Sequence, residues 1–304
     1  MIAFGCSIVT PEIYEARAKA GFDRAAEPGS AILALAAGGS LARSYNLLLG
    51  RAAELPELEA LVLVHEDAEI TDDRFCTKLR AALEDPDVGV VGCTGATGVR
   101  DLAWWDGAVT WNSAKYVYGE FGGGELRWQP DTVLAPGEVD SVYGVLMALT
   151  PWVVQNLRFD ESVGVSHGYD FDICSKAREA GRKVVAADLE VAHHHALDVV
   201  EETEIWVAAH MRAAELWDRS GPHDPADPAW KLRARQAEAA AAAARLLAAS
   251  ELLRLDATAN QHARQQRDIE RSRSWRLTAS LRRGNALRRS ARKRIGSVLR
   301  RAAR

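Results

Sequence analysis

The sequence lacks the features that would suggest a secreted or membrane-spanning protein. Its 304 residues contain four cysteines with neither paired nor metal-type spacing: Cys6, Cys76, Cys93 and Cys174. The start, MIAFGCSIVT, has neither the basic residues nor the apolar core of a signal peptide. No window of about 20 residues is free of charge, so no membrane-spanning helix is expected. We therefore expect a reduced, cytoplasmic protein.

Charge is distributed unevenly along the chain. The net charge is only −4, and 48% hydrophobic with 26% charged residues is ordinary for a soluble protein. Residues 261–304, however, hold 15 Lys and Arg but only 2 Asp and Glu, whereas residues 1–260 hold 23 basic and 40 acidic residues. This asymmetry predicts an acidic globular body followed by a basic arm for an anionic surface.

The first third of the chain alternates between strand-like and helix-like stretches. Apolar runs predict strands at 2–9, 30–37, 58–64 and 88–96, and helical patterns lie between them at 11–21, 40–54 and 72–85. Such alternation is typical of an α/β fold with a parallel sheet. The chain is long enough for one large α/β domain with an appendage.

Regular patterning stops at 101–138, where four tryptophans and a glycine run predict loops together with a hairpin over one face of the sheet. It returns with a strand at 139–149, helices at 151–157 and 169–181, and a further strand before residue 195. Residues 224–255 are rich in Ala, Leu and Arg and predict a long helix outside the sheet.

Three polar clusters each follow an apolar run. They are 65–69 (HEDAE), 169–172 (YDFD) and 193–195 (HHH). In open α/β sheets, ligands bind beyond the carboxyl ends of the strands. Carboxylates and imidazoles can bind a divalent cation, and a carboxylate in the first turn of a helix could accept a proton. Each cluster alone could equally be a solvated strand exit, a set of helix N-terminal acids or a polar loop.

The order and spacing of these clusters resemble family 2 of the nucleotide-sugar glycosyltransferases, which have the GT-A fold, and most closely a bacterial glycosyltransferase-like branch. Three stretches carry the resemblance over roughly residues 1–200: SLARSYNLLLGRA, ALVLVHEDAEI and FDESVGVSHGYDFDICSKAREAGRKVVAADLEVAHHH. The second resembles a strand ending in the DxD motif. The resemblance implies a Rossmann-like mixed sheet flanked by helices, over residues 1–215, with a helical, basic extension over 216–304.

The resemblance also implies a role for each matching residue. Asp170 would be the catalytic base of an inverting transfer, supported by Asp172. The implied metal ligands, for Mn²⁺ or Mg²⁺, are Asp67, Glu69, His193 and His194. The implied donor-binding residues are Asn46, His65, Glu66, Asp67, Tyr143 and Gly144, where His65 stands in the position often held by the first Asp of DxD. An acceptor glycan or glycolipid, of the kind used for bacterial surface polysaccharide, would meet Trp104, Trp105 and Glu161.

Other interpretations of the sequence remain open. A catalytically silent scaffold that binds glycan or membrane is favoured by His65 and by a second strand that ends without acids. A nucleotidyltransferase is the weaker alternative, because no Gly-rich, basic phosphate loop occurs early in the chain. The arm at 274–304 has apolar residues every three or four positions among Arg, which suits a helix on an anionic membrane surface. A solvated arm is the plainer alternative, and no nucleic-acid reader motif accompanies the charge.

Overall fold

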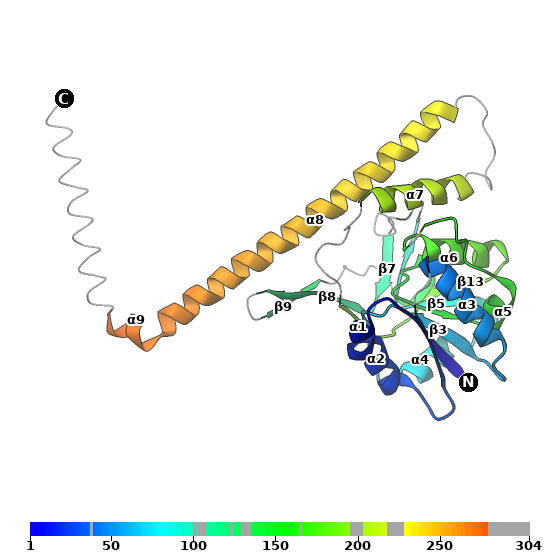
Figure 1. Cartoon of the computed structure of the whole chain (residues 1–304), viewed down its shortest axis with the longest axis horizontal. Helices are drawn as coiled ribbons and strands as arrows, with labels where there is room; N and C mark the ends of the chain where they lie inside the picture. The colour runs from blue at the N-terminus through cyan, green and yellow to red at the C-terminus, as the bar shows by residue number, and fades with distance from the viewer. Residues whose placement is uncertain are drawn as a thin grey trace. The chain divides into compact units, whose positions relative to one another are not determined.

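The computed structural model describes most of the chain (Figure 1). The described residues are 1–36, 39–99, 102, 108–121, 124–128, 135–164, 166–194, 203–217 and 228–278. They form two compact units, Met1–Glu120 with Glu125–Leu252, and Phe121–Gly124 with Leu253–Arg304. The boundary predicted at residues 215 and 216 stays a prediction.

A seven-stranded mixed sheet forms the centre of the first unit. Its strand order is β10-β13-β5-β12-β3-β1-β2. The strands are β1 (Ile2–Ile8), β2 (Ala31–Ala36), β3 (Ala60–Val64), β5 (Val88–Gly92), β10 (Gly137–Val139), β12 (Leu146–Leu149) and β13 (Lys183–Ala186). β1 runs parallel to β2 and β3, and β13 runs parallel to β5, whereas β12 is antiparallel to both of its neighbours, β3 and β5. The expected α/β class with a mixed sheet is confirmed.

Helices pack on both faces of this sheet. In chain order, the helices of the described residues are α1 (Pro11–Ala16), α2 (Ala18–Ala25), α3 (Leu41–Ala53), α4 (Phe75–Ala82), α5 (Pro151–Asn156), α6 (Tyr169–Glu179), α7 (Thr203–Trp217), α8 (Pro228–Arg271) and α9 (Arg273–Leu277). Those that pack on this sheet are α2 to α6. On one face, buried residues of α3, α5 and α6 share a core cluster with β3 and β12. On the other face, the Phe4 ring of β1 packs against Phe22 of α2 and Phe75 of α4, with centroids 5.3 and 6.0 Å away.

Two small sheets complete the first unit. One has the order β11-β6-β7 and the other β4-β14-β8-β9. Their strands are β4 (Ala68–Ile70), β6 (Thr94–Thr97), β7 (Ala108–Asn112), β8 (Ala114–Phe121), β9 (Gly124–Trp128), β11 (Ser141–Val142) and β14 (Val191–His194). Residues 101–138 were expected to form loops and a hairpin. The consecutive strands β8 and β9 are neighbours in one sheet, as a hairpin requires, but β7, β8 and β9 together give this segment more strand than was expected.

Other local differences have simple physical causes. The predicted helix at 11–21 is two helices, because Arg17 leaves the helical region with φ −124° and ψ −81°. The predicted strand at 139–149 is three short strands, since Asp140 and the segment from Tyr143 to Val145 break the pairing. The helix predicted at 224–255 continues to Arg271 as α8. No helix of the described residues is long and apolar enough to cross a membrane.

Candidate metal and catalytic site

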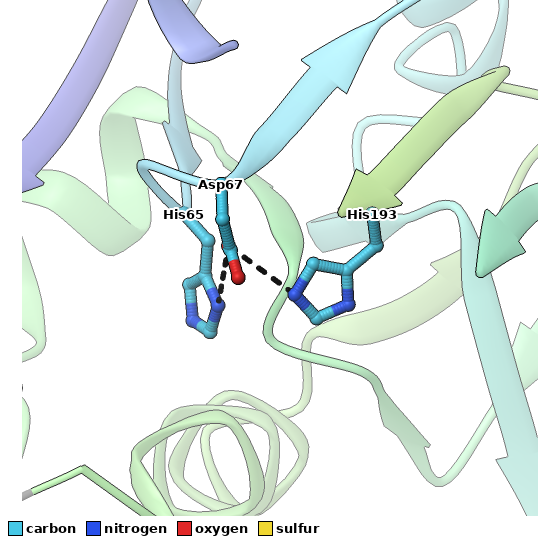
Figure 2. Close-up of side chains that lie close together, drawn as sticks. All are labelled: His65, Asp67 and His193. Atoms are coloured by element: carbon cyan, nitrogen blue, oxygen red, sulfur yellow. Dashed lines mark ion pairs between the residues drawn. The ribbon is translucent and has the colours of Figure 1, made fainter. Parts of the chain in front are cut away.

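Three potential metal ligands come together where β3 ends (Figure 2). β3 is buried along its whole length, and the chain turns immediately after it, with the Ala68 N–H donating to the His65 carbonyl at 3.1 Å. β4 starts at Ala68 and pairs antiparallel with β14, placing His193 opposite Ala68. This pairing brings His193 beside Asp67, although the two residues are far apart in the sequence.

The three side chains are close enough to share one ion. His193 Nε2 lies 3.3 Å from Asp67 Oδ1, and His65 Nδ1 lies 3.9 Å from the same oxygen. One ligand atom from each residue can be chosen so that all three lie within 4.8 Å of one another. Two atoms that each bind an ion at about 2.1 Å are separated by roughly 3.0 to 4.2 Å, depending on the geometry. The distances from Asp67 Oδ1 to the two imidazole nitrogens, 3.3 and 3.9 Å, both fall in this range and so suit a shared divalent cation. The side chain of His193 is buried, whereas those of Asp67 and His65 are 24% and 23% exposed and reachable by a ligand.

Two of the predicted metal ligands lie in a different group. His194 follows His193 on β14 and points to the opposite face of the strand, since side chains alternate. Its Nε2 lies 3.6 Å from Glu69 Oε2, and Arg24 donates to Glu69 Oε1 at 2.8 Å. The structure thus does not bring Glu69 and His194 into the three-residue cluster. His65, predicted only as a donor-binding residue, takes part in it instead.

The carboxylate of Glu66 is bound by backbone groups. The N–H groups of Val9 and Thr10 donate to Glu66 Oε2 at 2.6 and 2.9 Å. Glu66 therefore ties the turn after β3 to the segment that follows β1, so both strand ends are held together at this edge of the sheet. Its predicted contact with a donor remains a prediction.

Asp170 lies in the first turn of α6 and is held by two backbone donors. Gly144 N–H donates to Oδ2 and Phe171 N–H to Oδ1, each at 2.9 Å. Burial nevertheless raises the pKa of Asp170, because the charged carboxylate loses hydration. A carboxylate can accept further hydrogen bonds beside these two. Asp170 is thus a partly buried base with a higher proton affinity than an ordinary aspartate.

Tyr169, next to Asp170 in the sequence, contacts the candidate ion site. Its hydroxyl is hydrogen-bonded to His65 Nε2, while its ring packs on Gly144. The ring of Tyr143, just before Gly144, lies 5.9 Å from that of His193. The segment Tyr143–Gly144 therefore lies between the two groups, because the Gly144 N–H bonds Asp170 and the Tyr143 ring is near His193. Sequence reasoning missed Tyr169, although an aromatic residue immediately before Asp170 was a visible signal.

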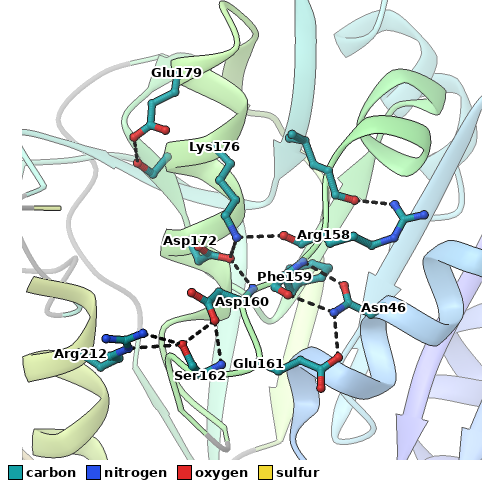
Figure 3. Close-up of polar contacts among 12 residues, drawn as sticks. Asn46, Arg158, Phe159, Asp160, Glu161, Ser162, Asp172, Lys176, Glu179 and Arg212 are labelled. Atoms are coloured by element: carbon teal, nitrogen blue, oxygen red, sulfur yellow. Dashed lines mark hydrogen bonds and ion pairs between the residues drawn. The ribbon is translucent and has the colours of Figure 1, made fainter. Parts of the chain in front are cut away.

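Asn46 and Asp172 hold a neighbouring loop (Figure 3). Asn46 Nδ2 donates to the Phe159 carbonyl at 3.0 Å and to Glu161 Oε1 at 3.2 Å, and its Oδ1 accepts from Phe159 N–H at 2.9 Å. Asp172 Oδ2 accepts from Asp160 N–H and from Lys176 Nζ, both at 2.8 Å. These bonds give Asn46 and Asp172 a structural task in fixing the loop, beside the roles predicted for them. Among the other predicted residues, Trp104, Trp105 and His195 lie outside the described part of the chain.

The fold and site are those of an α/β protein with a candidate divalent-metal centre and a buried carboxylate, Asp170, that is a candidate base. Residues 26–223 match the profile of a family described as a glycosyltransferase-like family, and the chain belongs to that family. A curated relative, the streptomycin biosynthesis protein StrF of Streptomyces griseus, is 27% identical over 204 residues. The match covers 64% of this chain and 66% of StrF, slightly less than two thirds of that relative.

Among solved structures, the chain resembles the mannosyltransferase PcManGT from Pyrobaculum calidifontis in complex with GDP-Man and Mn²⁺. The two are 14% identical with a TM-score of 0.47, over 92% of this chain and 83% of that one.

Proposed function

We propose that the chain is an inverting glycosyltransferase that moves a sugar from a nucleotide-diphosphate donor to a glycan or glycolipid acceptor. Membership of a glycosyltransferase-like family supports the reaction class. The observation that carries the assignment is the placement of Asp170 beside Gly144 and Tyr169, next to the cluster of His65, Asp67 and His193. A base and an ion site at one sheet edge are what in-line sugar transfer needs.

In this mechanism, Asp170 takes the proton from the acceptor hydroxyl. The acceptor oxygen forms a bond to the anomeric carbon as the bond from that carbon to the diphosphate oxygen breaks. The electron pair of the broken bond leaves with the diphosphate, and the sugar inverts its configuration. The raised pKa of Asp170 assists the step, because a carboxylate with higher proton affinity is a better general base.

His65, Asp67 and His193 would hold a divalent ion, Mn²⁺ or Mg²⁺, and the donor diphosphate. Such an ion, when bound, neutralises the negative charge that develops on the leaving diphosphate. We propose that the sugar-nucleotide donor binds against Tyr143 and Gly144. Glu66 and Asn46 are proposed donor-binding residues as well, farther from the ion site. Trp104, Trp105 and Glu161 remain the proposed acceptor residues.

The basic C-terminal arm is proposed to hold the protein on the inner face of the plasma membrane. In α9, the Leu277 side chain is 81% exposed and the Trp275 side chain is 38% exposed, in a segment dominated by Arg. Exposed apolar side chains among cations suit an anionic lipid surface. Surface polysaccharide synthesis would fit this location. Because StrF is named for streptomycin biosynthesis, the acceptors tested for sugar transfer should include small molecules.

The proposal is tested by incubating the protein with a panel of sugar nucleotides and following release of the nucleoside diphosphate, with and without acceptors. We expect one donor to be consumed by the wild type and not by Asp170→Asn. A general base contributes about 10²- to 10⁴-fold to the rate. Melting temperatures of both proteins, with and without the donor, control for folding and binding. The contrary outcome has two parts: no donor is consumed or raises the melting temperature, and the protein binds glycan or anionic vesicles. That outcome would replace the enzyme hypothesis with a catalytically silent scaffold.

A further inference from the structure

The two edges of the seven-stranded sheet differ in how they are protected from other chains. The edge strand β10 has three residues and contains the exposed Glu138. The opposite edge strand, β2, has six residues, and residues 29–42 around it include no charged residue and no proline. Shortness, charge and proline are features by which natural proteins keep an edge strand from pairing with another chain. β10 has two of these features, whereas β2 has none of them.

The outer edge of β2 is open in the part of the chain that the structure describes. There, β2 is hydrogen-bonded to β1 alone, with Ala36 opposite Ile8. Every second residue, from Ala31 to Leu35, packs on the core shared with α3, but none of the six residues is fully buried. An edge strand presents a row of unpaired backbone N–H and C=O groups. The outer edge of β2 can therefore form a second ladder with an extended segment.

Exposed apolar side chains lie on the elements around this edge. Ile32 of β2 is 44% exposed, and Leu47 of α3, which packs on β2, is 55% exposed. Among the described residues before α8, the other exposed large apolar side chains are Val9 and Ile13, and both closely follow β1, the neighbour of β2. Exposed apolar groups that gather in one region of a surface are typical of a contact with another molecule.

The sequence of β2 favours a second copy of this chain as the partner. A two-fold axis perpendicular to the sheet would place a second β2 antiparallel to the first and keep each face of the sheet continuous. Residues opposite each other in a sheet share a face, so for the longest overlap the axis passes through Leu33 or Ala34. Either register pairs only Ala, Leu and Ile side chains, because β2 has the sequence AILALA. The edge of β2 is thus complementary to itself.

The same axis would bring the two α3 helices together. α3 has 13 residues and β2 has six, so each is about 20 Å long, and α3 runs back along β2. Leu47 is the middle residue of α3 and would therefore lie near the axis. Asn46 bonds Phe159 on the α5 side of the helix. Because side chains advance by about 100° per residue, Leu47 turns away from α5 and toward the β2 side.

We propose that β2 pairs antiparallel with β2 of a second copy, which gives a two-fold dimer with one continuous sheet and an apolar contact formed by Ile32 and Leu47. Because the strands of the two copies run in opposite directions, the candidate sites at the ends of the two β3 strands would face opposite ends of the dimer. Each site would stay open to its own substrates. The inference concerns assembly alone and does not depend on the proposed reaction.

The first experiment measures the mass of the full chain by analytical ultracentrifugation over a range of micromolar concentrations. We expect twice the chain mass of 33.1 kDa for the wild type. Ile32→Lys puts a charge on the strand edge, as protected edges do, and should give the mass of a single chain. Leu255→Lys is the matched control, because it places the same charge at an exposed leucine of α8, and it should leave the dimer intact.

Leu47→Glu provides a second variant that leaves β2 itself unchanged. It should raise the dissociation constant of the dimer by about tenfold or more, because Leu47 would be buried near the centre of the contact. Melting temperatures confirm that each variant is folded. A monomeric wild type would overturn the proposal. So would a dimer that Leu255→Lys dissociates while the folded variants at Ile32 and Leu47 keep it.

The second experiment follows amide hydrogen exchange in the peptide that covers β2, at low and at high protein concentration. Backbone N–H groups exchange slowly when they are hydrogen-bonded in a ladder and quickly when they are open to water. We expect the protection of β2 to rise with concentration in the wild type and to stay constant in Ile32→Lys. Protection at the exposed part of α8 should not depend on concentration.

Two results of the exchange experiment would refute strand pairing between copies. One is a dimer that forms while the exchange of β2 stays unchanged, since the contact would then lie elsewhere. The other is protection of β2 by anionic lipid vesicles under conditions in which the chain is monomeric, since the edge would then belong to a membrane contact.

Discussion

Gly144→Ala offers the sharpest test of the contact between the β12 entry segment and α6. A Cβ atom on residue 144 would lie 2.6 Å from two ring carbons of Tyr169, far inside van der Waals contact. The Tyr169 ring cannot simply move aside, because it is 5% exposed, packs against Tyr45 and Phe159, and is hydrogen-bonded to His65. One added methyl group must therefore displace either α6 or the segment before β12.

Overpacking of this kind costs about 1 to 3 kcal/mol. For a domain of about 200 residues, each kcal/mol lowers the melting temperature by about 2 to 4 °C, so we expect a fall of roughly 2 to 12 °C. The same shift would disturb the Gly144 N–H bond to Asp170, so donor turnover should fall with stability. Differential scanning calorimetry and donor consumption measure the two effects.

Gly50→Ala is the matched control. Gly50 is an exposed residue inside α3, and beyond its own helix backbone no atom of the described residues lies within 4 Å of the position that an added Cβ would take. Replacing an exposed helical Gly by Ala should stabilise the protein by about 0.5 to 1 kcal/mol. If Gly144→Ala melts at or above the wild-type temperature and turns over donor normally, the close packing of Tyr169 on Gly144 is refuted.

Three further predictions concern the acids and the loop that they hold. Asn46→Ala removes three hydrogen bonds to the segment at Phe159 and should cost about 1 to 3 kcal/mol of stability, read as a lower melting temperature. Asp172→Asn keeps an oxygen that accepts from the Asp160 N–H, so its donor turnover should stay within about tenfold of the wild-type rate. Asp170→Asn should lower donor turnover by about 10²-fold or more. Equal losses in the two variants would contradict the separate roles of these residues. Because burial raises the pKa of Asp170 and the base must be ionised, turnover should fall with decreasing pH at a higher pH than an ordinary aspartate allows. A rate that stays flat down to about pH 4 would contradict this assignment.

Part of the site could be predicted from the sequence because it follows from strand ends. The buried run of β3 stops at His65, and β14 ends in histidines, so both had to deliver polar groups near a sheet edge. Which histidine joins Asp67 could not be predicted. Residues 193 and 194 point to opposite faces, and the choice depends on the register that pairs His193 with Ala68 of β4.

In the central sheet, too, features set by neighbouring residues in the sequence could be predicted, and those set by distant residues could not. The parallel order of β1, β2 and β3 follows from alternating strand and helix patterns. The antiparallel position of β12 between β3 and β5 could not be predicted, because a run of four apolar residues does not indicate in which direction the strand runs. The strands β7 to β9 were not placed one by one, because the alternating stretches of β7 (VTWN) and β9 (ELRW) are only four residues long, too short to be told from loop segments.

The insertion of β12 also has a consequence during synthesis of the protein. β3 has β1 on one side and receives its other neighbour only when Leu146–Leu149 has emerged, long after Val64. For several seconds of translation, the nascent chain therefore carries an unpaired, wholly apolar strand edge. Such an edge invites pairing with another chain. Shielding by a chaperone, rather than spontaneous collapse alone, would then set the yield of folded protein.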